Sequence, residues 1–218
     1  MSRSVAVTNN MPTSPSPRYP LALLTLVSLA FIWSGIHPKE YFTWALEVFP
    51  VVLSAVLLLA TFRRFRLTNL LYTLIAMHML VLLVGGHYTY GEVPLFNWIR
   101  DTFHQSRNNY DRPAHFFQGF VPAILAREIL IRSSPLKGSK WLPFVVVCIC
   151  LAFSACYELF EWQVSIWTGS GGDAFLGTQG DIWDTQKDMA MALVGATCAV
   201  CTMGKWHDRG LRKLQESK

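Results

Sequence analysis

The chain has 218 residues, of which 52% are hydrophobic and only 15% are charged. A soluble domain usually carries about 25% charged residues, so this composition is typical of a membrane protein, and the length fits one polytopic domain. The net charge of +5 does not indicate nucleic-acid binding, because the basic residues lie in short clusters between apolar runs, where they encode orientation in a membrane.

Along the chain, a polar beginning is followed by six apolar segments. Residues 1–19 are rich in Ser, Pro, Thr and Asn, and we expect a disordered cytoplasmic tail there. Each apolar segment approaches or exceeds the roughly 20 residues that a helix needs to cross the hydrocarbon core. The segments are residues 20–36, 41–62, 68–86, 112–131, 141–167 and 184–204.

The first apolar segment is the shortest, so a secretory signal peptide is the alternative there. No small-residue cleavage site follows it and a long polar stretch precedes it, so we expect an uncleaved span. The sequence therefore predicts an all-α, polytopic transmembrane bundle of six spans over residues 20–206, with a basic cytoplasmic tail at 207–218. All five cysteines lie inside apolar runs, and we expect them to be small buried hydrophobic residues.

The Lys and Arg residues are distributed unequally between the two sides of this bundle. Thirteen fall on the side of the two termini and five on the other, with Arg127 left aside as intramembrane. Cytoplasmic loops carry the excess of Lys and Arg, so both termini are expected to be cytoplasmic. The outer loops, residues 86–111 and 168–183, are rich in Gly and aromatic residues, and we expect them to form short structure that folds over the bundle.

Acidic and histidine side chains gather at the outer ends of spans four, five and six. Ionisable groups at membrane depth are costly, so they usually lie in a protein interior or a wet cavity and mark function. In span four, Asp111 and His115 are four residues apart and share a helix face. Helix capping explains Asp111 alone, but it does not explain His115 one turn deeper. These two residues are the candidates for acid–base catalysis.

Span five carries Glu158 and Glu161, three residues apart near its outer end. Like charges at this spacing repel, and desolvation makes the repulsion worse. Either one carboxyl group is protonated, or the charge is compensated by a cation, by His115 or by Arg112.

The last span opens with Asp181, Asp184 and Asp188. A capping box and the helix dipole explain the first two without any function. Asp188 lies two turns in, and seven residues at 100° each bring it to within about 20° of Asp181. This pattern indicates one acidic stripe that descends into the bundle. Because oxygen ligands suit Mg²⁺, Mn²⁺ or Ca²⁺, we predict a divalent-cation site at Glu158, Glu161, Asp184 and Asp188.

Other ionisable residues are weaker signals. His78 lies mid-span, where a neutral imidazole bonded to a neighbouring helix explains it better than haem ligation does. Glu47 lies near the outer end of span two, close to the level of the acidic stripe. Arg127 and Glu128 lie near the inner interface, where snorkelling explains Arg127. No P-loop, zincin, nucleophile-elbow or dinucleotide-binding motif occurs in the sequence.

With these residues in view, the chain resembles the YjdF-like family of bacterial inner-membrane proteins. The stretches that carry the resemblance are GGHYTYGEVPLFNW, NNYDRPAHFFQGF, YELFEW and DAFLGTQGDIWDTQKDM. More distantly, the order DxxxH, acid-bearing helix and DxxxD followed by Gly is similar to VanZ-like membrane proteins, which implies an association with the cell envelope. Asp188 departs from that pattern, which more often has Asn there. The counterparts would be Asp111, His115, Glu158 or Glu161, Asp184, Asp188 and Gly195.

Three function classes fit these residues. The first is an enzyme in which a divalent cation assists chemistry on a lipid-linked or phosphorylated envelope substrate, with His115 as general acid or base. The second is an ion- or proton-coupled transporter in which the same acids bind the cargo. The third is a non-catalytic membrane scaffold whose acids make interhelical hydrogen bonds. Bound metal would favour the first two classes, and turnover of a substrate would separate the enzyme from the transporter.

Overall fold

The computed structural model describes residues 17–216, and within them it contains helices and no strand, so the all-α prediction is confirmed. Residues 1–16 of the predicted tail lie outside the described residues, and Arg18 already belongs to the first helix. The elements are α1 (Arg18–Gly35), α2 (Tyr41–Thr61), α3 (Asn69–Tyr88), η1 (Tyr90–Glu92), α4 (Pro94–Thr102), α5 (Asp111–Ser133), α6 (Leu142–Thr168), η2 (Gly169–Gly172), α7 (Asp173–Leu176) and α8 (Asp184–Glu216).

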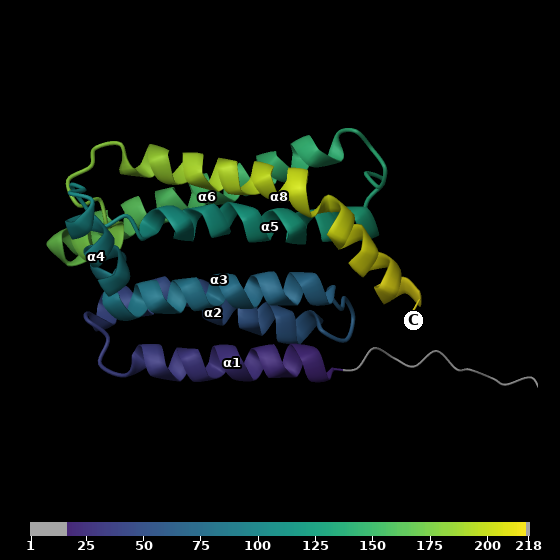
Figure 1. Cartoon of the computed structure of the whole chain (residues 1–218), viewed down its shortest axis with the longest axis horizontal. Helices are drawn as coiled ribbons and strands as arrows, with labels where there is room; N and C mark the ends of the chain where they lie inside the picture. Colours follow the sequence, from purple (N-terminus) through teal and green to yellow (C-terminus); the bar gives the residue numbers. More distant parts are fainter. Residues whose placement is uncertain (1–16, 217–218) are drawn as a thin grey trace, which may run out of the picture.

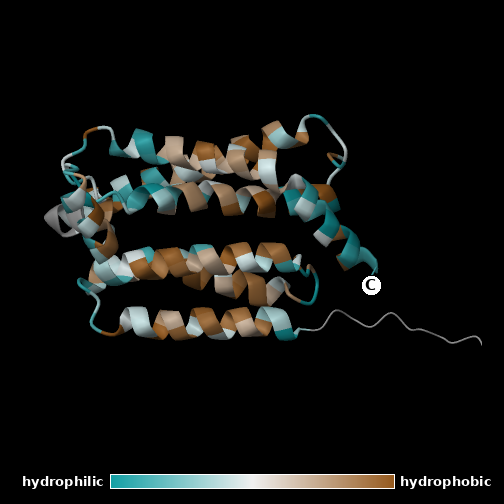
Figure 2. Cartoon of the chain, viewed as in Figure 1, coloured by the Kyte–Doolittle hydropathy of each residue, from teal (hydrophilic) through white to brown (hydrophobic). Residues whose placement is uncertain are grey.

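Six of these helices, α1, α2, α3, α5, α6 and α8, are long and apolar enough to cross a membrane. They form two sets of three, with α1, α2 and α3 in one set and α5, α6 and α8 in the other (Figure 1). The sets meet where α3 packs against α5. Hydrophobic residues concentrate in the middle of the bundle and hydrophilic residues at its two ends (Figure 2).

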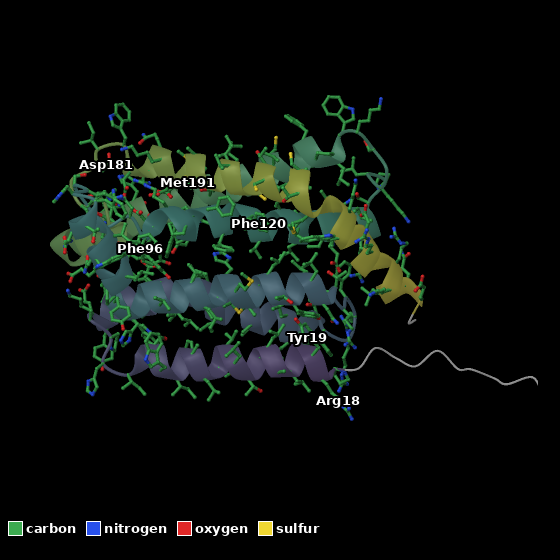
Figure 3. All side chains as sticks on the ribbon, viewed as in Figure 1. Arg18, Tyr19, Phe96, Phe120, Asp181 and Met191 are labelled. Carbon is green, nitrogen blue, oxygen red and sulfur yellow. The ribbon has the colours of Figure 1, made fainter. Side chains whose placement is uncertain are left out.

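The two ends of the bundle differ in their connections. Arg18 and Tyr19 lie at one end, whereas Phe96 and Asp181 lie at the other, where α4 crosses the bundle (Figures 1 and 3). Following the Lys and Arg bias, we name these the inner end and the outer end. The outer connections fold into η1, α4, η2 and α7, in agreement with the short structure expected from their composition.

The closest approach between spans joins α5 and α8, which share the most extensive helix–helix contact. A Cβ atom at Gly119 would collide with the backbone carbonyl of Ala192, and one at Gly195 would collide with the carbonyl of Phe116. Small residues at helix crossings let membrane helices approach this closely, because hydrocarbon chains supply no hydrophobic drive for association. Gly119 and Gly195 thus allow α5 and α8 to pack closely, and both helices carry residues of the site.

Two expectations need correction. Of the five cysteines, only Cys150 is buried, whereas Cys148, Cys156 and Cys201 lie on the exposed surface of the spans; an apolar surface is stable there because the surroundings are lipid. In addition, the basic tail predicted from residue 207 onward is not separate from the last span. The α8 helix continues to Glu216, and its 33 residues make it about 50 Å long, well beyond the hydrocarbon core.

Candidate functional site

The segment that precedes α5 is fixed in place by the outer loops. Asn108 is fully buried and its backbone carbonyl accepts a hydrogen bond from Gln179 Nε2 at 2.8 Å. The Asn108 N–H donates in return to Gln179 Oε1 at 3.1 Å, and its side chain donates to the Val93 carbonyl at 3.1 Å. This pairing of two loops far apart in sequence holds the neighbouring residue, Arg107, above the end of α8.

Arg107 and Arg112 bind the aspartates of α5 and α8. Arg107, in the loop before α5, is buried, pairs with Asp111 four residues later, and donates from Nη1 to Asp184 Oδ1 at 2.5 Å. Arg112 donates from Nη1 to Asp188 Oδ1 at 2.5 Å and from Nη2 to Asp184 Oδ1 at 3.0 Å. Arginine suits this task because its planar fork of donors satisfies several carboxylate oxygens at once.

Neither Asp111 nor Asp181 occupies the N-cap position of its helix, so the capping explanation fails for both. Asp111 does not cap α5, whose N-cap position is occupied by Tyr110 without a side-chain cap bond. Asp181 Oδ1 accepts from the Trp183 N–H at 3.1 Å, which forms a turn just before α8. Asp181 Oδ2 also accepts from Lys187 Nζ at 2.6 Å, and this bond lowers the pKa of the Asp181 carboxyl group.

Below the arginines, His115 lies between Glu158 and Asp188. Its Nδ1 atom is 3.8 Å from Glu158 Oε1, and its Nε2 atom is 3.8 Å from Asp188 Oδ2. Both separations exceed hydrogen-bond length. Glu158 is only 5% exposed, and both its Oε1 atom and His115 Nδ1 are buried without a hydrogen-bond partner among residues 17–216. Because buried polar atoms are nearly always satisfied, this pair calls for an explanation.

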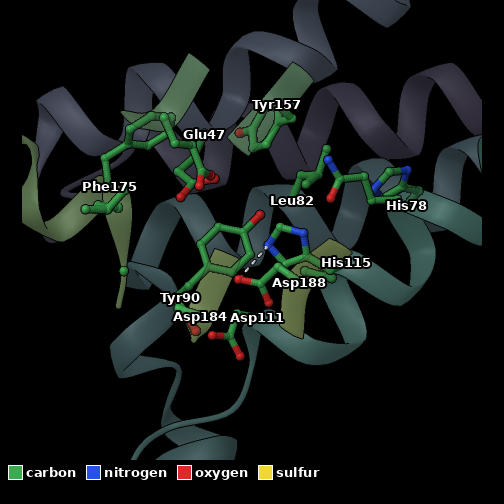
Figure 4. Close-up of a pocket in the computed structure, with 15 residues that line it drawn as sticks. Glu47, His78, Leu82, Tyr90, Asp111, His115, Tyr157, Phe175, Asp184 and Asp188 are labelled. Atoms are coloured by element: carbon green, nitrogen blue, oxygen red, sulfur yellow. Dashed lines mark ion pairs between the residues drawn. The ribbon is translucent and has the colours of Figure 1, made fainter. Parts of the chain in front are cut away.

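His115 and Asp188, together with Asp111 and Asp184, line a cavity of about 80 Å³ whose wall also includes Glu47, His78, Glu161 and Phe175 (Figure 4). Such a volume has room for an ion and a few water molecules. The cavity begins at the aspartates of the outer end and reaches His78, at the middle of α3. The acids therefore converge on enclosed space and not on lipid.

Tyr90 forms part of the same wall. Its ring packs directly on α3 at Gly85, where a Cβ atom would come within 2.6 Å of the ring. The absence of a side chain at this glycine therefore makes the approach possible. Burial and the nearby Glu47 carboxyl group raise the pKa of Tyr90 well above its usual value. The phenol therefore stays protonated and donates a hydrogen bond to Glu47.

The structure brings the predicted site residues together in two groups that share Asp188. In each group the potential ligand atoms lie within 4.8 Å of one another. Glu161 lines the same cavity but belongs to neither group. Guanidinium groups contact every acid of the second group, although Asp111 Oδ1 has no hydrogen-bond partner in the described part of the chain. In the first group, His115 Nδ1 and Glu158 Oε1 face each other and neither has a partner among those residues. The groups are His115, Glu158 and Asp188, and Asp111, Asp184 and Asp188.

Sequence reasoning missed the burial of Arg107, which it counted as an outer-loop charge. Helical spacing gave no signal, because Arg107 lies in the loop before α5 and its pairing with Asp111 depends on the path of that loop. The participation of Tyr90 and Tyr157 in the cavity wall likewise had no signal in the sequence. We name as the outer cluster the residues Arg107, Asp111, Arg112, His115, Glu158, Asp181, Asp184 and Asp188.

A second buried cluster lies at the inner end of the same two helices. Glu128 is fully buried and accepts from Thr68 Oγ1 at 2.9 Å, from Arg132 Nη1 at 2.7 Å and from His207 Nε2, 2.9 Å away. Arg127 does not snorkel as expected, because its guanidinium group contacts His207 Nδ1 at 2.6 Å and Asp208 at 2.7 Å. We name these the inner cluster: Thr68, Arg127, Glu128, Arg132, His207 and Asp208.

Comparisons with known proteins agree with this architecture. A family described as "Predicted membrane protein (DUF2238)" matches residues 19–209. The chain is 50% identical over 191 residues to the inner membrane protein YjdF of Escherichia coli (strain K12), which covers 88% of this chain and 91% of that protein. No solved structure matches the chain. The resemblance to YjdF-like proteins is thereby confirmed, and the chain belongs to the DUF2238 family as a multi-pass protein of the bacterial inner membrane.

Proposed function

We propose that the outer cluster binds a divalent cation and that this cation assists chemistry on a phosphorylated or lipid-linked envelope substrate. The observation that carries the proposal is the pair of buried, unpartnered atoms His115 Nδ1 and Glu158 Oε1 beside Asp188. A scaffold built from interhelical hydrogen bonds would be expected to satisfy such atoms, as the inner cluster does.

The distances in this group suit a shared ion. Metal–ligand bonds to imidazole nitrogen and carboxylate oxygen are about 2.0–2.2 Å long, so two ligands of one ion lie about 3–4 Å apart. Only one ring nitrogen of His115 can bind a given ion, so either its 3.8 Å separation from Glu158, at Nδ1, or its 3.8 Å separation from Asp188, at Nε2, applies. One ligand atom from each of the three residues lies within 4.8 Å of the others. One nitrogen and two carboxylates suit Mn²⁺ or Zn²⁺ better than Ca²⁺, which prefers oxygen ligands alone.

The charge of the outer cluster supports the same conclusion. With all acids ionised and His115 neutral, five carboxylates face three cations, which leaves two negative charges uncompensated. One divalent ion would balance them without protonating any acid. The acids are Asp111, Asp181, Asp184, Asp188 and Glu158, and the cations are Arg107, Arg112 and Lys187.

Each residue then has a separate role. His115, Glu158 and Asp188 hold the ion, and Asp111 orients Arg107 and does not transfer protons. Arg112 is 18% exposed at its side chain, so it can contact a substrate oxygen while remaining paired with Asp188. A bound cation polarises phosphoryl oxygens. The outer end also lies at the level of the lipid headgroups, which favours a substrate that is itself anchored in the membrane.

The transporter alternative receives less support. Between His78 and the inner cluster, the buried faces of α3 and α5 are apolar and include Leu71, Ile75 and Ile124. A coupled carrier needs polar groups or water along its path. Among the described residues, the cavity of the outer cluster stops at His78.

Thermal unfolding of detergent-purified protein tests the proposal, with Mn²⁺, Zn²⁺ or Mg²⁺ compared against EDTA. We expect the metal to raise the melting temperature of the wild type, and elemental analysis to find bound metal. Glu158→Gln should abolish the metal-dependent rise. Glu161→Gln is the matched control, because it neutralises a buried carboxyl group on the same helix that belongs to neither group of ligand atoms, and it should retain the rise.

A lipid phosphate then tests the substrate class. Dihexanoyl phosphatidic acid should raise the melting temperature further in Mn²⁺ and should lose this increment in Glu158→Gln. Equal melting of the wild type in metal and in EDTA would refute the cation site. Metal binding without any metal-dependent effect of the lipid phosphate would refute the substrate assignment alone.

A further inference from the structure

The end of α8 and the start of α3 enclose a cavity of about 470 Å³ at the inner end of the bundle. Thr68 of the inner cluster borders it, and the other residues of the two buried clusters do not line it. Gly210 of α8 packs against Thr68, with its Cβ position 3.4 Å from the threonine methyl group. This contact fixes the final turns of α8 beside the first turn of α3.

The lining of this cavity is basic. Arg209 and Lys213 come from α8 and Arg66 from the loop before α3, and no acidic residue of the described chain lines the cavity. The acid nearest to Arg209 in sequence, Asp208, is already paired with Arg127. Arg209 and Lys213 are exposed and form no hydrogen bond or ion pair with another residue in the range 17–216.

The cavity lies at the depth of the inner-leaflet headgroups. A helix that starts at Asp184 needs about 20 residues to cross the hydrocarbon core, so it leaves the core near Gly204. Trp206, just beyond that point, is 58% exposed and lines the cavity, as expected for an interfacial tryptophan. Trp206, Arg209 and Lys213 follow one another at spacings of three and four residues, which places them on one helix face.

We propose that this cavity binds the phosphate of an anionic phospholipid from the cytoplasmic leaflet, with Arg209 and Lys213 contacting the phosphate and Trp206 contacting the glycerol and upper acyl region. Basic pockets between membrane helices on the cytoplasmic side suit such headgroups. The orientation of the spans in the membrane does not require these basic residues to line one cavity, because a basic residue anywhere in a short loop contributes to topology. A cavity lined by two unpaired cations and a tryptophan is a more specific feature.

The test titrates the full-length, detergent-purified chain with dioctanoyl phosphatidylglycerol and reads binding by native mass spectrometry. EDTA is present throughout, so that metal at the outer end makes no contribution. We expect saturable binding of phosphatidylglycerol and not of dioctanoyl phosphatidylcholine or inorganic phosphate. The double variant R209Q/K213Q should weaken binding by about tenfold or more, since each cation near an anionic surface contributes about fivefold.

Two further variants distinguish a loss of this binding cavity from a general loss of positive charge. Arg212→Gln removes one positive charge from the same helix without removing a lining residue, and it should change binding less than twofold. The charge-conserving variant R209K/K213R should bind like the wild type. If Arg212→Gln weakens binding as much as R209Q/K213Q does, or if phosphatidylcholine binds as tightly, the proposed site does not exist. These results are independent of the metal dependence that tests the outer cluster.

Discussion

The inner and outer clusters join the same two helices, α5 and α8, yet they differ in how completely their polar atoms are satisfied. In the inner cluster, Glu128 accepts from the side chains of Thr68, Arg132 and His207. In the outer cluster, carboxylates outnumber cations, and the His115 and Glu158 atoms that face each other have no partner. His115 and three aspartates of the outer cluster also line a cavity.

This difference distinguishes a network that stabilises the fold from one that a ligand could complete. A buried polar network with every member satisfied rigidifies a fold and fixes one arrangement of its helices. A network that leaves buried atoms unpaired is costly unless something else completes it. The comparison therefore supports a structural role for the inner end and the ligand binding that we propose for the outer end, and each role predicts a different response to substitution.

The largest expected effect is in a test of membrane topology, because a reporter fusion gives a signal that is specific to one side of the membrane. Reporter fusions after Ser133 and after Lys218 should be cytoplasmic, and a fusion near Gly171 should be external. This follows from the Lys and Arg bias and from the even number of spans. An external C-terminus would contradict the orientation, and the two clusters would exchange compartments.

Glu128→Leu should be the most destabilising point substitution of those compared here. It leaves Arg132 and His207 without their shared acceptor in a buried environment, which costs about 3 kcal/mol or more. Unfolding in mixed detergent–SDS micelles measures the change, and it should be equal in Mn²⁺ and in EDTA. Glu128→Gln is the milder control, since its amide oxygen can still accept from Thr68. A metal-dependent loss would contradict a purely structural inner cluster.

Arg112→Gln should have a smaller effect that depends on metal. In EDTA the loss of charge-assisted bonds to Asp184 and Asp188 should cost about 2 kcal/mol. Mn²⁺ should restore much of the stability, because the ion balances the freed carboxylates. Lys187→Gln, which removes an exposed cation of the same cluster, serves as the control. If Mn²⁺ stabilised Arg112→Gln no more than the wild type, the charge-balance argument would fail.

Asp181→Asn should have the smallest effect. Asn caps a turn about as well as Asp does, so the bond from the Trp183 N–H is retained. The lost charge pairs with the exposed Lys187 at 2.6 Å and only at 3.5 Å or more with Arg112 and Arg107, so the cost is small. The melting temperature should match the wild type in metal and in EDTA. A metal-dependent change at this position would show that the cation site extends to the membrane surface.

The sequence was sufficient to predict the class of fold and the gathering of acidic and histidine side chains at one end of the bundle, because both depend on local patterns. Apolar run length defines the spans, and acids at the outer ends of three of them indicate convergence. The partners of individual side chains could not be predicted, since Arg112 pairs with Asp188 across 76 residues and Glu128 with His207 across 79. Such pairs depend on how α5 and α8 are rotated against each other, which the contact at Gly119 and Gly195 determines.

The close packing of α5 against α8 has a consequence for biosynthesis. The chain is made from its N-terminus, so α8 is the last of the six spans to leave the ribosome. Until it does, Arg112 lacks Asp184 and Asp188, and Glu128 lacks His207. Packing of α8 against α5 at Gly119 and Gly195 then completes both clusters together. A nascent chain interrupted before α8 would leave unpaired charges inside the membrane, which marks it for removal by quality-control proteases before it can bind any ligand.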